Sequence, residues 1–279
     1  MIVEAARAKL NLALHVRRRR EDGYHELETL FAFVAHGDEV RLSDADTAAF
    51  AVVGQFAAGL ATEGDNLVTR AAALFEHSFG ALPPLAITLD KRLPVASGIG
   101  GGSADAAAVL RALGRRPAAP EALGADVPVC LASVPARMRG LGEIVDPLPG
   151  VPALHLVLVN PRVPVSTPEV FRALRRRDNP GLPDLPAGGD AALLVEWLKA
   201  TRNDLQPPAI GLAPVIADAL AALVDAGAAL ARMSGSGATC FGIFPDAAAA
   251  LRAAQSIAAV RPGWWIADTR TLPSPARPR

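Results

Sequence analysis

The chain has 279 residues, of which 51% are hydrophobic and 20% are charged, so it is long enough for two domains and too apolar for a disordered protein. Its 28 basic and 28 acidic residues give a formal net charge of zero, which excludes a global field that would hold nucleic acid or an anionic membrane. The start, MIVEAARAKLN, lacks the apolar core of a signal peptide, and no run of about 18 apolar residues follows. Cys130 and Cys240 stand in apolar runs and predict buried free thiols in a cytoplasmic protein.

The first third of the chain predicts mainly β-structure. Apolar residues alternate from Leu10 to Val16, and strand patterns resume over residues 27–34 and 39–42. The four arginines of residues 17–20 precede a Glu-Asp-Gly turn, which favours a solvated hairpin turn over a nucleic-acid patch. We expect a helix over residues 65–75 and a strand over residues 85–89.

The middle of the chain contains a strand end, a glycine loop and an Ala-rich helix in succession, LPVASGIGGGSADAAAVLRAL. A second helix is expected near Pro120. Proline and glycine are densest over residues 146–152, where we place a boundary between domains 1–148 and 149–279.

The second half predicts alternating strands and helices. Strands are expected at LHLVLVN, on both sides of the turn in ARMSGSGATCFGIF, and at WWIADT. Helices are expected after Ser166 and over residues 191–198, 213–226 and 246–259, with a mobile connection over residues 175–190. The whole pattern predicts an α+β protein whose second domain has two layers.

The run from Gly98 to Asp105 opens directly into a helix, where free backbone N–H groups and the helix dipole favour an anion such as phosphate. Glycine permits positive φ angles and a close approach of the backbone to phosphate oxygens. The run lacks the lysine of a Walker loop and has Ser103 where the dinucleotide pattern needs its third glycine. HRD and DFG protein-kinase signatures are absent. A plain tight turn remains the alternative interpretation.

Pro94 to Ala104 resembles the central motif of the GHMP kinases, Pro-x-x-x-Gly-Leu/Ile-Gly-Gly-Gly/Ser-Ser-Ala/Ser. Two further motifs of these kinases have counterparts, in order, at residues 8–11 (AKLN) and 233–238 (MSGSGA). The resemblance implies a two-domain α+β fold, with an N-terminal domain like ribosomal protein S5 domain 2 and a ferredoxin-like C-terminal domain. It also implies ATP and Mg²⁺ as cofactors.

Four other blocks resemble the diphosphocytidyl-methylerythritol kinase branch of these enzymes. They are DGYH with ETL at residues 22–30, DKRLP at 90–94, GADVP at 124–128 and GLGE at 140–143. This resemblance implies transfer of the ATP γ-phosphoryl group to the 2-hydroxyl of a cytidine diphosphate-linked methylerythritol. It covers nearly the whole chain and is weakest over residues 175–190. The segment before Asp126 is about ten residues shorter than the family pattern, which leaves the packing of Asp126 open.

Asp126 lies in an otherwise apolar stretch, where a carboxylate needs a partner. By the resemblance it is the general base, and Lys9 activates the acceptor hydroxyl beside it. A helix cap for Asp126 and a solvent-facing position for Lys9 are the structural alternatives.

The resemblance implies nucleotide-binding roles for residues of the first domain: Asn66, with Asp65 and Leu67 beside it, Lys91, Pro94, Gly98, Gly100, Gly101, Gly102, Ser103 and Ala104. No protein ligand for the metal is identified.

Tyr24 is the only tyrosine, and with His25 it follows the arginine turn. By the resemblance the pair contacts cytosine, with Phe171 adding a stacked ring; a core position is the alternative for Phe171. The other acceptor-binding residues implied are Asn11, Thr167, Gly235, Ser236 and Gly237. A bare hairpin turn is the alternative for the last three.

We read the other four histidines as structural, because none has ligand spacing with cysteines or acids. The implied partner is the small-molecule acceptor, without nucleic acid or membrane, and the implied assembly is a monomer or weak homodimer. Two functions remain as alternatives: a GHMP kinase for another alcohol or sugar, and a nucleotide-binding module of this fold without turnover.

Overall fold

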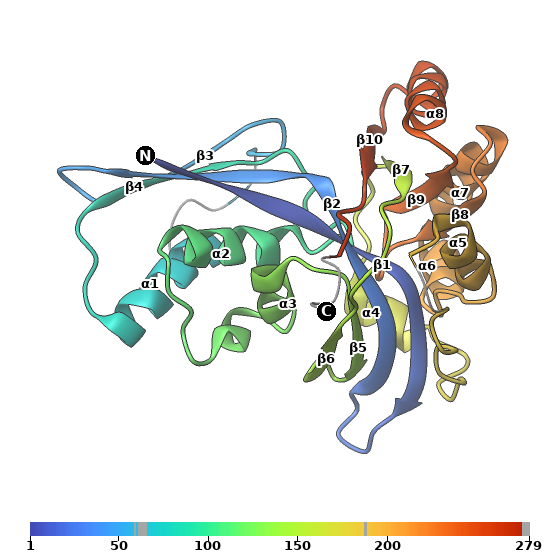
Figure 1. Cartoon of the computed structure of the whole chain (residues 1–279), viewed down its shortest axis with the longest axis horizontal. Coiled ribbons are helices and arrows are strands. Elements are labelled where there is room, and N and C mark those ends of the chain that lie inside the picture. Colours follow the sequence, from blue (N-terminus) through green and yellow to red (C-terminus); the bar gives the residue numbers. More distant parts are fainter. Residues whose placement is uncertain (59, 61–65, 187–188, 275–279) are drawn as a thin grey trace. The chain divides into compact units, whose positions relative to one another are not determined.

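The computed structural model describes residues 1–58, 60, 66–186 and 189–274. Ten strands, eight α-helices and one 3₁₀ helix (η1) form within this described part (Figure 1). The strands are β1 (Ile2–Arg19), β2 (His25–Asp44), β3 (Ala49–Val53), β4 (Leu85–Asp90), β5 (Ala136–Gly140), β6 (Ile144–Pro147), β7 (His155–Asn160), β8 (Leu230–Met233), β9 (Cys240–Phe244) and β10 (Trp265–Arg270). The helices are α1 (Leu67–Phe79), α2 (Gly101–Ala112), η1 (Pro120–Leu123), α3 (Val127–Ala132), α4 (Thr167–Arg172), α5 (Ala191–Lys199), α6 (Gln206–Leu212), α7 (Val215–Asp225) and α8 (Ala247–Val260).

The chain forms two compact units, and each is built from several segments. The first unit comprises Met1–Lys9, Gly37–Val95 and Gly100–Ser133, and the second comprises Leu10–His36, Ala96–Ile99 and Val134–Arg279. The grouping differs from a single division after residue 148, because β1 and β2 are long enough to contribute residues to both units.

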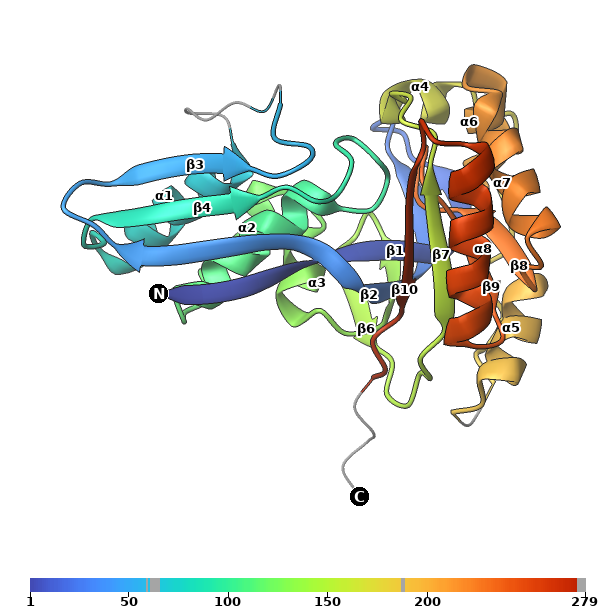
Figure 2. The ribbon, with the colours of Figure 1, turned by 90° about the horizontal axis from the view of Figure 1, so that it is seen from above.

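In the first unit, β4 pairs antiparallel with the C-terminal part of β2 and parallel with β3. Helices α1, α2 and α3 lie together on one side of β3 and β4 (Figures 1 and 2). Residues 104–110 of α2 are all buried, which explains the run of alanines: their small side chains permit close packing on every face of the helix. This packing holds the N-terminus of α2, where the glycine loop ends, in one position.

In the second unit, a four-stranded antiparallel sheet has the order β10-β7-β9-β8. Helices α7 and α8 cover one face of it (Figure 2). Buried apolar residues from both layers form the core, among them Val157, Val159, Ile216, Leu223 and Ile257. The predictions of an α+β protein and of a two-layer second domain are confirmed.

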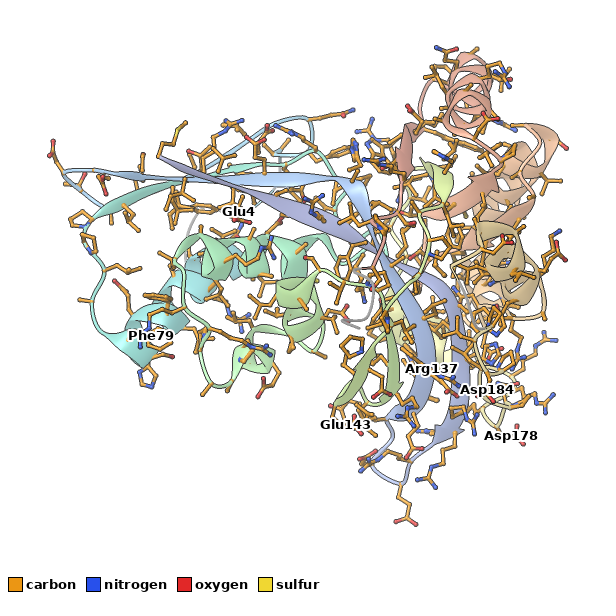
Figure 3. All side chains as sticks on the ribbon, in the orientation of Figure 1. Glu4, Phe79, Arg137, Glu143, Asp178 and Asp184 are labelled. Carbon is orange, nitrogen blue, oxygen red and sulfur yellow. The ribbon has the colours of Figure 1, made fainter. Side chains whose placement is uncertain are left out.

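The N-terminal half of β2 also belongs to the second unit, where it pairs with β5, which in turn pairs with β6. Arg137 on β5 (Figure 3) joins this sheet to the irregular segment after α4. Its guanidinium donates to Glu28 and to the carbonyl oxygen of Leu182, and the Leu182 N–H donates to Glu28 at 3.1 Å. The described part of residues 175–190 is therefore irregular, as predicted, but is anchored by hydrogen bonds.

Most predicted elements form close to their expected positions. β2 is one continuous strand where two were expected, and the helix expected near Pro120 is a single 3₁₀ turn. The strands β3, β5 and β6 and the helices α3 and α6 were not predicted from the sequence. Pro207 and Pro208 stand in the first turn of α6, where proline is tolerated because the N–H groups there have no partner within the helix. No helix in the described part of the chain is long and apolar enough to cross a membrane.

Candidate active site

A buried lysine and an aspartate form an ion pair in the first unit. Lys9 Nζ lies 2.7 Å from Asp126 Oδ2, and the two side chains are 6% and 35% exposed. Asp126 stands at the N-cap position of α3, but its side chain makes no capping hydrogen bond. Neither structural alternative therefore holds: Lys9 is not on a solvent-facing surface, and the Asp126 carboxylate is directed at an ammonium group rather than at the helix terminus.

The glycine loop lies against this ion pair. Gly100 has φ +67° at the N-cap of α2, and a Cβ there would lie 3.2 Å from Lys9 Cε. A Cβ on Gly124, two residues before Asp126, would lie 3.6 Å from Ser103 Oγ. The N–H groups of the first turn of α2 have no partner within the helix, so this unit places anion-binding donors beside a partly exposed carboxylate.

The other predicted nucleotide residues of the first unit surround this loop. Asn66 caps α1, with its Oδ1 accepting from the Val68 N–H at 2.9 Å, and a Cβ on Gly102 would lie 3.1 Å from the neighbouring Leu67. Pro94 and Ala104 are buried at either end of the loop, whereas Gly102 is exposed. The Asp65 position lies outside the described residues.

Lys91 lies at the centre of a buried charge network. Its Nζ donates to Asp38 at 2.5 Å and to Asp105 at 2.8 Å. Asp38 also accepts from the backbone N–H groups of Arg92 and Leu93. A Cβ on Gly101 would lie 3.2 Å from Lys91 Nζ. The network ties β2, α2 and the segment that leads into the glycine loop to one another.

Burial of the Asp105 carboxyl makes the free energy of unfolding of the protein depend on pH. Desolvation raises the Asp105 pKa from 3.8 to about 7, although the Lys91 charge acts in the opposite direction. The folded state then binds more protons than the unfolded state between these two values, so this group lowers the free energy of unfolding as pH rises. We expect Asp105→Asn to remove that contribution. Urea denaturation of both proteins from pH 4 to pH 7 measures the difference in slope, and equal slopes would contradict the assignment.

In the second unit, the start of the glycine loop packs against the loop of residues 234–238. A Cβ on Gly98, which has φ +73°, would lie 2.7 Å from the carbonyl oxygens of Ser234 and Gly237. Ser234 Oγ donates to the Gly98 carbonyl oxygen and accepts from the Asn11 N–H, both at 3.0 Å. A Cβ on Gly235 would lie 3.3 Å from Asn11 Oδ1. These contacts make residues 234–238 more than a bare hairpin turn.

Helix α4 carries two further predicted residues one turn apart. Thr167 Oγ1 and Ser236 Oγ share a hydrogen bond of 2.7 Å, and the rings of Phe171 and His25 stack with centroids 5.1 Å apart and an interplanar angle of 27°. Residues four apart lie on the same helix face, so α4 brings the loop at Ser236 and the start of β2 to one surface of this unit. Phe171 is half-buried.

His25 has an unused hydrogen-bonding atom. Its Nε2 is buried and has no hydrogen-bond partner within the described parts of the chain. Burial lowers the His25 pKa, with the charges of Arg177 and Arg19 acting in the same direction, so the ring is neutral at pH 7. Tyr24 is 67% exposed. A neutral stacked ring with a free nitrogen and an exposed neighbouring phenol are groups that a planar heterocycle can use.

Several residues that shape the site were missed from the sequence. Asp38 and Asp105 hold Lys91, Thr29 accepts from the Asn11 side chain at 2.8 Å, and Asn203 donates to the carbonyl oxygens of Met233 and Gly235. Asp105 stands inside the glycine motif, so an acidic residue in an otherwise apolar helix was a usable signal. Thr29 lies in the ETL block of the family resemblance, whereas Asp38 and Asn203 carry no local signal.

The cysteine prediction is confirmed: Cys130 and Cys240 are both buried and free. Burial raises the Cys130 pKa to about 12, so its thiol is neutral at pH 7 and is no nucleophile. Within the described residues, no group of three or more His, Cys, Asp or Glu side chains is placed to hold a metal ion.

Comparison with known proteins agrees with this geometry. Residues 66–119 match the family described as "GHMP kinases N terminal domain", and residues 170–262 match "GHMP kinases C terminal". A 4-diphosphocytidyl-2-C-methyl-D-erythritol kinase of Paracoccus denitrificans is 58% identical over 97% of both chains. One of Ruegeria pomeroyi is 54% identical over 98% of this chain and 100% of its own.

Solved structures agree as well. A crystal structure of 4-(cytidine 5'-diphospho)-2C-methyl-D-erythritol kinase superposes with a TM-score of 0.80 at 36% identity, covering 97% of this chain and 100% of its own. Mevalonate kinase of L. major shares the fold, with a TM-score of 0.70 at 14% identity over 99% of this chain and 97% of its own. The predicted GHMP kinase fold is confirmed. The chain belongs to the family of 4-diphosphocytidyl-2-C-methyl-D-erythritol kinases.

Proposed function

We propose that this protein transfers the γ-phosphoryl group of ATP to the 2-hydroxyl of 4-diphosphocytidyl-2-C-methyl-D-erythritol, a step in the methylerythritol phosphate route to isoprenoid precursors. The observation that carries the proposal is the ion pair of Lys9 and Asp126, 2.7 Å long, beside the glycine loop. Phosphoryl transfer needs positioning, charge stabilisation and a group that accepts the proton of the hydroxyl. The ion pair and the loop supply these three elements.

Asp126 acts as the general base. Its carboxylate is 35% exposed, so a substrate hydroxyl has access to it, and the ion pair with Lys9 orients it. The ammonium group of Lys9 also favours the alkoxide that develops on the acceptor oxygen. The backbone N–H groups at Gly101, Gly102 and Ser103 bind the ATP phosphates.

A divalent cation such as Mg²⁺ neutralises phosphate charge when bound, as in other phosphoryl-transfer enzymes. The donors at the loop are backbone N–H groups and the Ser103 hydroxyl, and the described residues contain no cluster of metal-ligating side chains. The N–H groups would bind the phosphates and not the metal, so the nucleotide phosphates would be the main ligands of the metal. Ser103 is the side chain that could contact the metal or one of its water ligands.

The second unit supplies the acceptor-binding groups. His25, Tyr24 and Phe171 bind the cytosine ring by stacking and through the free Nε2 of His25. Backbone groups of Gly235, Ser236 and Gly237 bind the diphosphate, with Thr167 orienting Ser236 and Asn11 orienting the loop. Asn66 and Lys91 contribute to the ATP-binding site. Lys91 does so indirectly, through the charge network that holds the glycine loop.

Replacing Phe171 with alanine is expected to raise the acceptor KM by roughly five-fold to 150-fold, because the stacked cytosine loses about 1–3 kcal/mol of binding free energy. The KM for ATP should stay within about two-fold of the native value, since Phe171 is not part of the glycine loop that binds the ATP phosphates. Steady-state kinetics with each substrate varied in turn measures both values. Phe171→Tyr keeps the ring and is the matched control. An unchanged acceptor KM in the alanine variant would remove Phe171 from the acceptor site.

The direct test of the reaction is incubation of the purified protein with Mg·ATP and the acceptor. Acceptor-dependent ADP release and a product heavier by one phosphoryl group are expected. ATP binding without turnover would favour a different acceptor or a non-catalytic module. Competition by CMP or CDP separates these cases, because only a cytidine pocket responds to them.

We further propose that the protein works in the cytoplasm as a monomer or weak homodimer. The buried free thiols of Cys130 and Cys240 support a reducing compartment. Sedimentation velocity over a hundred-fold range of concentration measures the assembly state, and a stable larger oligomer at the lowest concentration would contradict it.

A further inference from the structure

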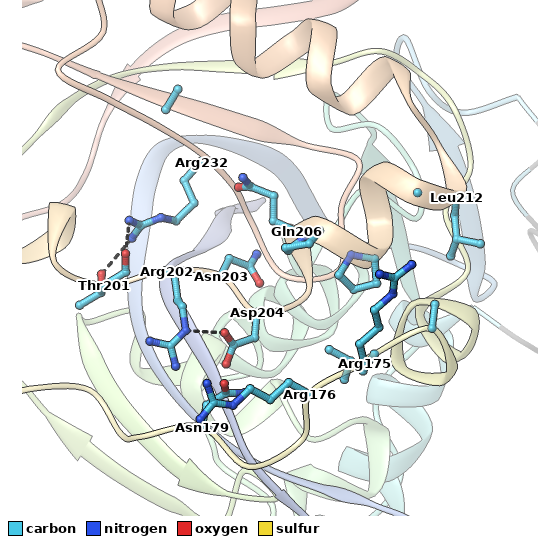
Figure 4. Close-up of a pocket in the computed structure, with 16 residues that line it drawn as sticks. Arg175, Arg176, Asn179, Thr201, Arg202, Asn203, Asp204, Gln206, Leu212 and Arg232 are labelled. Carbon is cyan, nitrogen blue, oxygen red and sulfur yellow. Dashed lines mark hydrogen bonds and ion pairs between the residues drawn. The ribbon is translucent and has the colours of Figure 1, made fainter.

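The second unit contains a large pocket that the kinase reaction does not use. It has a volume of about 880 Å³ and is lined by residues of three segments, 173–179, 201–212 and 231–232 (Figure 4). None of the residues assigned to ATP or the acceptor lines it. Its volume is in the range of small-molecule sites, about 300–1,000 Å³.

The charges of the pocket are unbalanced. Its lining contains four arginines, Arg175, Arg176, Arg202 and Arg232, and one acid, Asp204. Both carboxylate oxygens of Asp204 are already used: Oδ1 accepts from Arg202 Nε at 2.6 Å, and Oδ2 accepts from the Val16 N–H at 2.7 Å. Among the described residues, Arg176 pairs only with the exposed Asp178, at 3.5 Å. The pocket therefore carries an excess of positive charge.

Arg232 contributes a buried charge that is not paired with any carboxylate of the described residues. The residue is 5% exposed, and its guanidinium donates to the carbonyl oxygens of Leu12, Leu198 and Thr201 and to the Thr201 hydroxyl, all neutral acceptors. Burial lowers its pKa to about 10, so it remains charged at pH 7. Burying a charge without a counter-ion is costly, and a bound anion would reduce that cost.

Arg202 has an unused donor in the same pocket. Its Nη2 is buried and has no hydrogen-bond partner in the described part of the structure. Arg175 is exposed at the pocket rim and forms no ion pair with any described residue. Planar guanidinium groups with free donors match the oxygens of phosphate better than lysine does.

The pocket also has an apolar side. Pro207, Pro208 and Leu212 of α6 line it, together with Leu174, two residues beyond α4. In Figure 4, the Leu212 side chain lies apart from Arg202 and Arg232, with Arg175 nearer to it. Arginines combined with an apolar surface suit an anionic head group that carries a short hydrocarbon chain.

We propose that this pocket is a second ligand site that binds a small diphosphate, and that an ester with a short apolar chain binds more tightly than the inorganic ion. The arginine side takes the diphosphate oxygens, and α6 takes the chain. The proposal is independent of the kinase reaction, because it uses no residue of the catalytic or substrate-binding sets.

Calorimetric titration with inorganic pyrophosphate and with isopentenyl diphosphate tests the proposal, with the candidate active site filled by saturating AMP-PNP, Mg²⁺ and CDP. We expect one binding event in the native protein, tighter for the five-carbon ester. Arg175→Gln and Arg202→Gln should each weaken it by roughly ten-fold to a hundred-fold, the loss expected for a hydrogen bond to a charged group. Arg252→Gln, an exposed position on α8, is the matched control and should bind as the native protein does.

No binding by the native protein under these conditions would overturn the proposal. So would undiminished binding in both pocket variants, or an equal loss in the Arg252 control, which would indicate non-specific attraction to positive charge. Arg175 makes no hydrogen bond or ion pair to another described residue, so Arg175→Gln keeps the test valid if Arg202→Gln folds poorly.

Discussion

Asp126→Asn is expected to lower kcat by about 10²- to 10⁴-fold, the usual contribution of a general base. The amide keeps the size of the carboxylate but cannot accept the proton of the acceptor hydroxyl. It also removes the carboxylate that lies 2.7 Å from Lys9 Nζ in the native protein. Steady-state measurement of ADP release under saturating substrates gives kcat directly.

The same variant should keep its affinity for nucleotide, because the donors to the ATP phosphates are backbone N–H groups of α2. Calorimetric titration with AMP-PNP is expected to give a Kd within about three-fold of the native value, well below the ten-fold that corresponds to 1.4 kcal/mol. Asp225→Asn, an exposed acid on α7, removes the same charge elsewhere and should leave kcat unchanged. Near-native turnover by Asp126→Asn would remove the general-base assignment.

Lys91→Met is expected to lower the free energy of unfolding by about 3–5 kcal/mol, as found when one partner of a buried ion pair is removed. Lys91 is the cation that the buried carboxylates of Asp38 and Asp105 share, and its own side chain is only 5% exposed. Methionine fills the space of the lysine stem but provides no charge. Urea denaturation at pH 7 measures the loss.

Lys199→Met is the matched control, because Lys199 pairs with Glu196 on an exposed face of α5. Exposed pairs of this kind contribute about 0–1 kcal/mol. Equal losses in the two variants would show that the Lys91 network adds nothing to stability. Lys91→Met should also weaken AMP-PNP binding, since Asp38 holds the backbone of Arg92 and Leu93 just before the glycine loop.

The pH prediction for Asp105 tests a different property of this network. Two acids share one lysine, and burial disfavours the second negative charge. Asp105→Asn should therefore cost much less stability at pH 7 than Lys91→Met, because the amide still accepts a hydrogen bond from the ammonium group while Asp38 remains its counter-ion.

The sequence alone determined the local structure and the motifs. The alternation of apolar residues from Leu10 to Val16 predicted β1, because successive side chains of a strand point to opposite faces. The structure buries both faces of this stretch. The run of Gly98 to Ser103 before an alanine-rich segment predicted a loop that opens a helix, because the rules for helix termini are local. The family also followed from the sequence, since each of its motifs is a short contiguous run, and the same motifs contain Lys9 and Asp126, the predicted catalytic pair.

Only the tertiary structure decided which distant groups meet. Lys9 and Asp126 are 117 positions apart. Asp38, Lys91 and Asp105 come from β2, the segment after β4 and α2. The attraction between these groups depends on distances in space that their spacing in the sequence does not give. The same holds for the ring stack of His25 and Phe171 and for the arginine pocket. Burial and contact between remote segments arise when strands pair and helices pack, so the pKa of Asp105 and the uncompensated charge of Arg232 are properties of the fold rather than of any local run of residues.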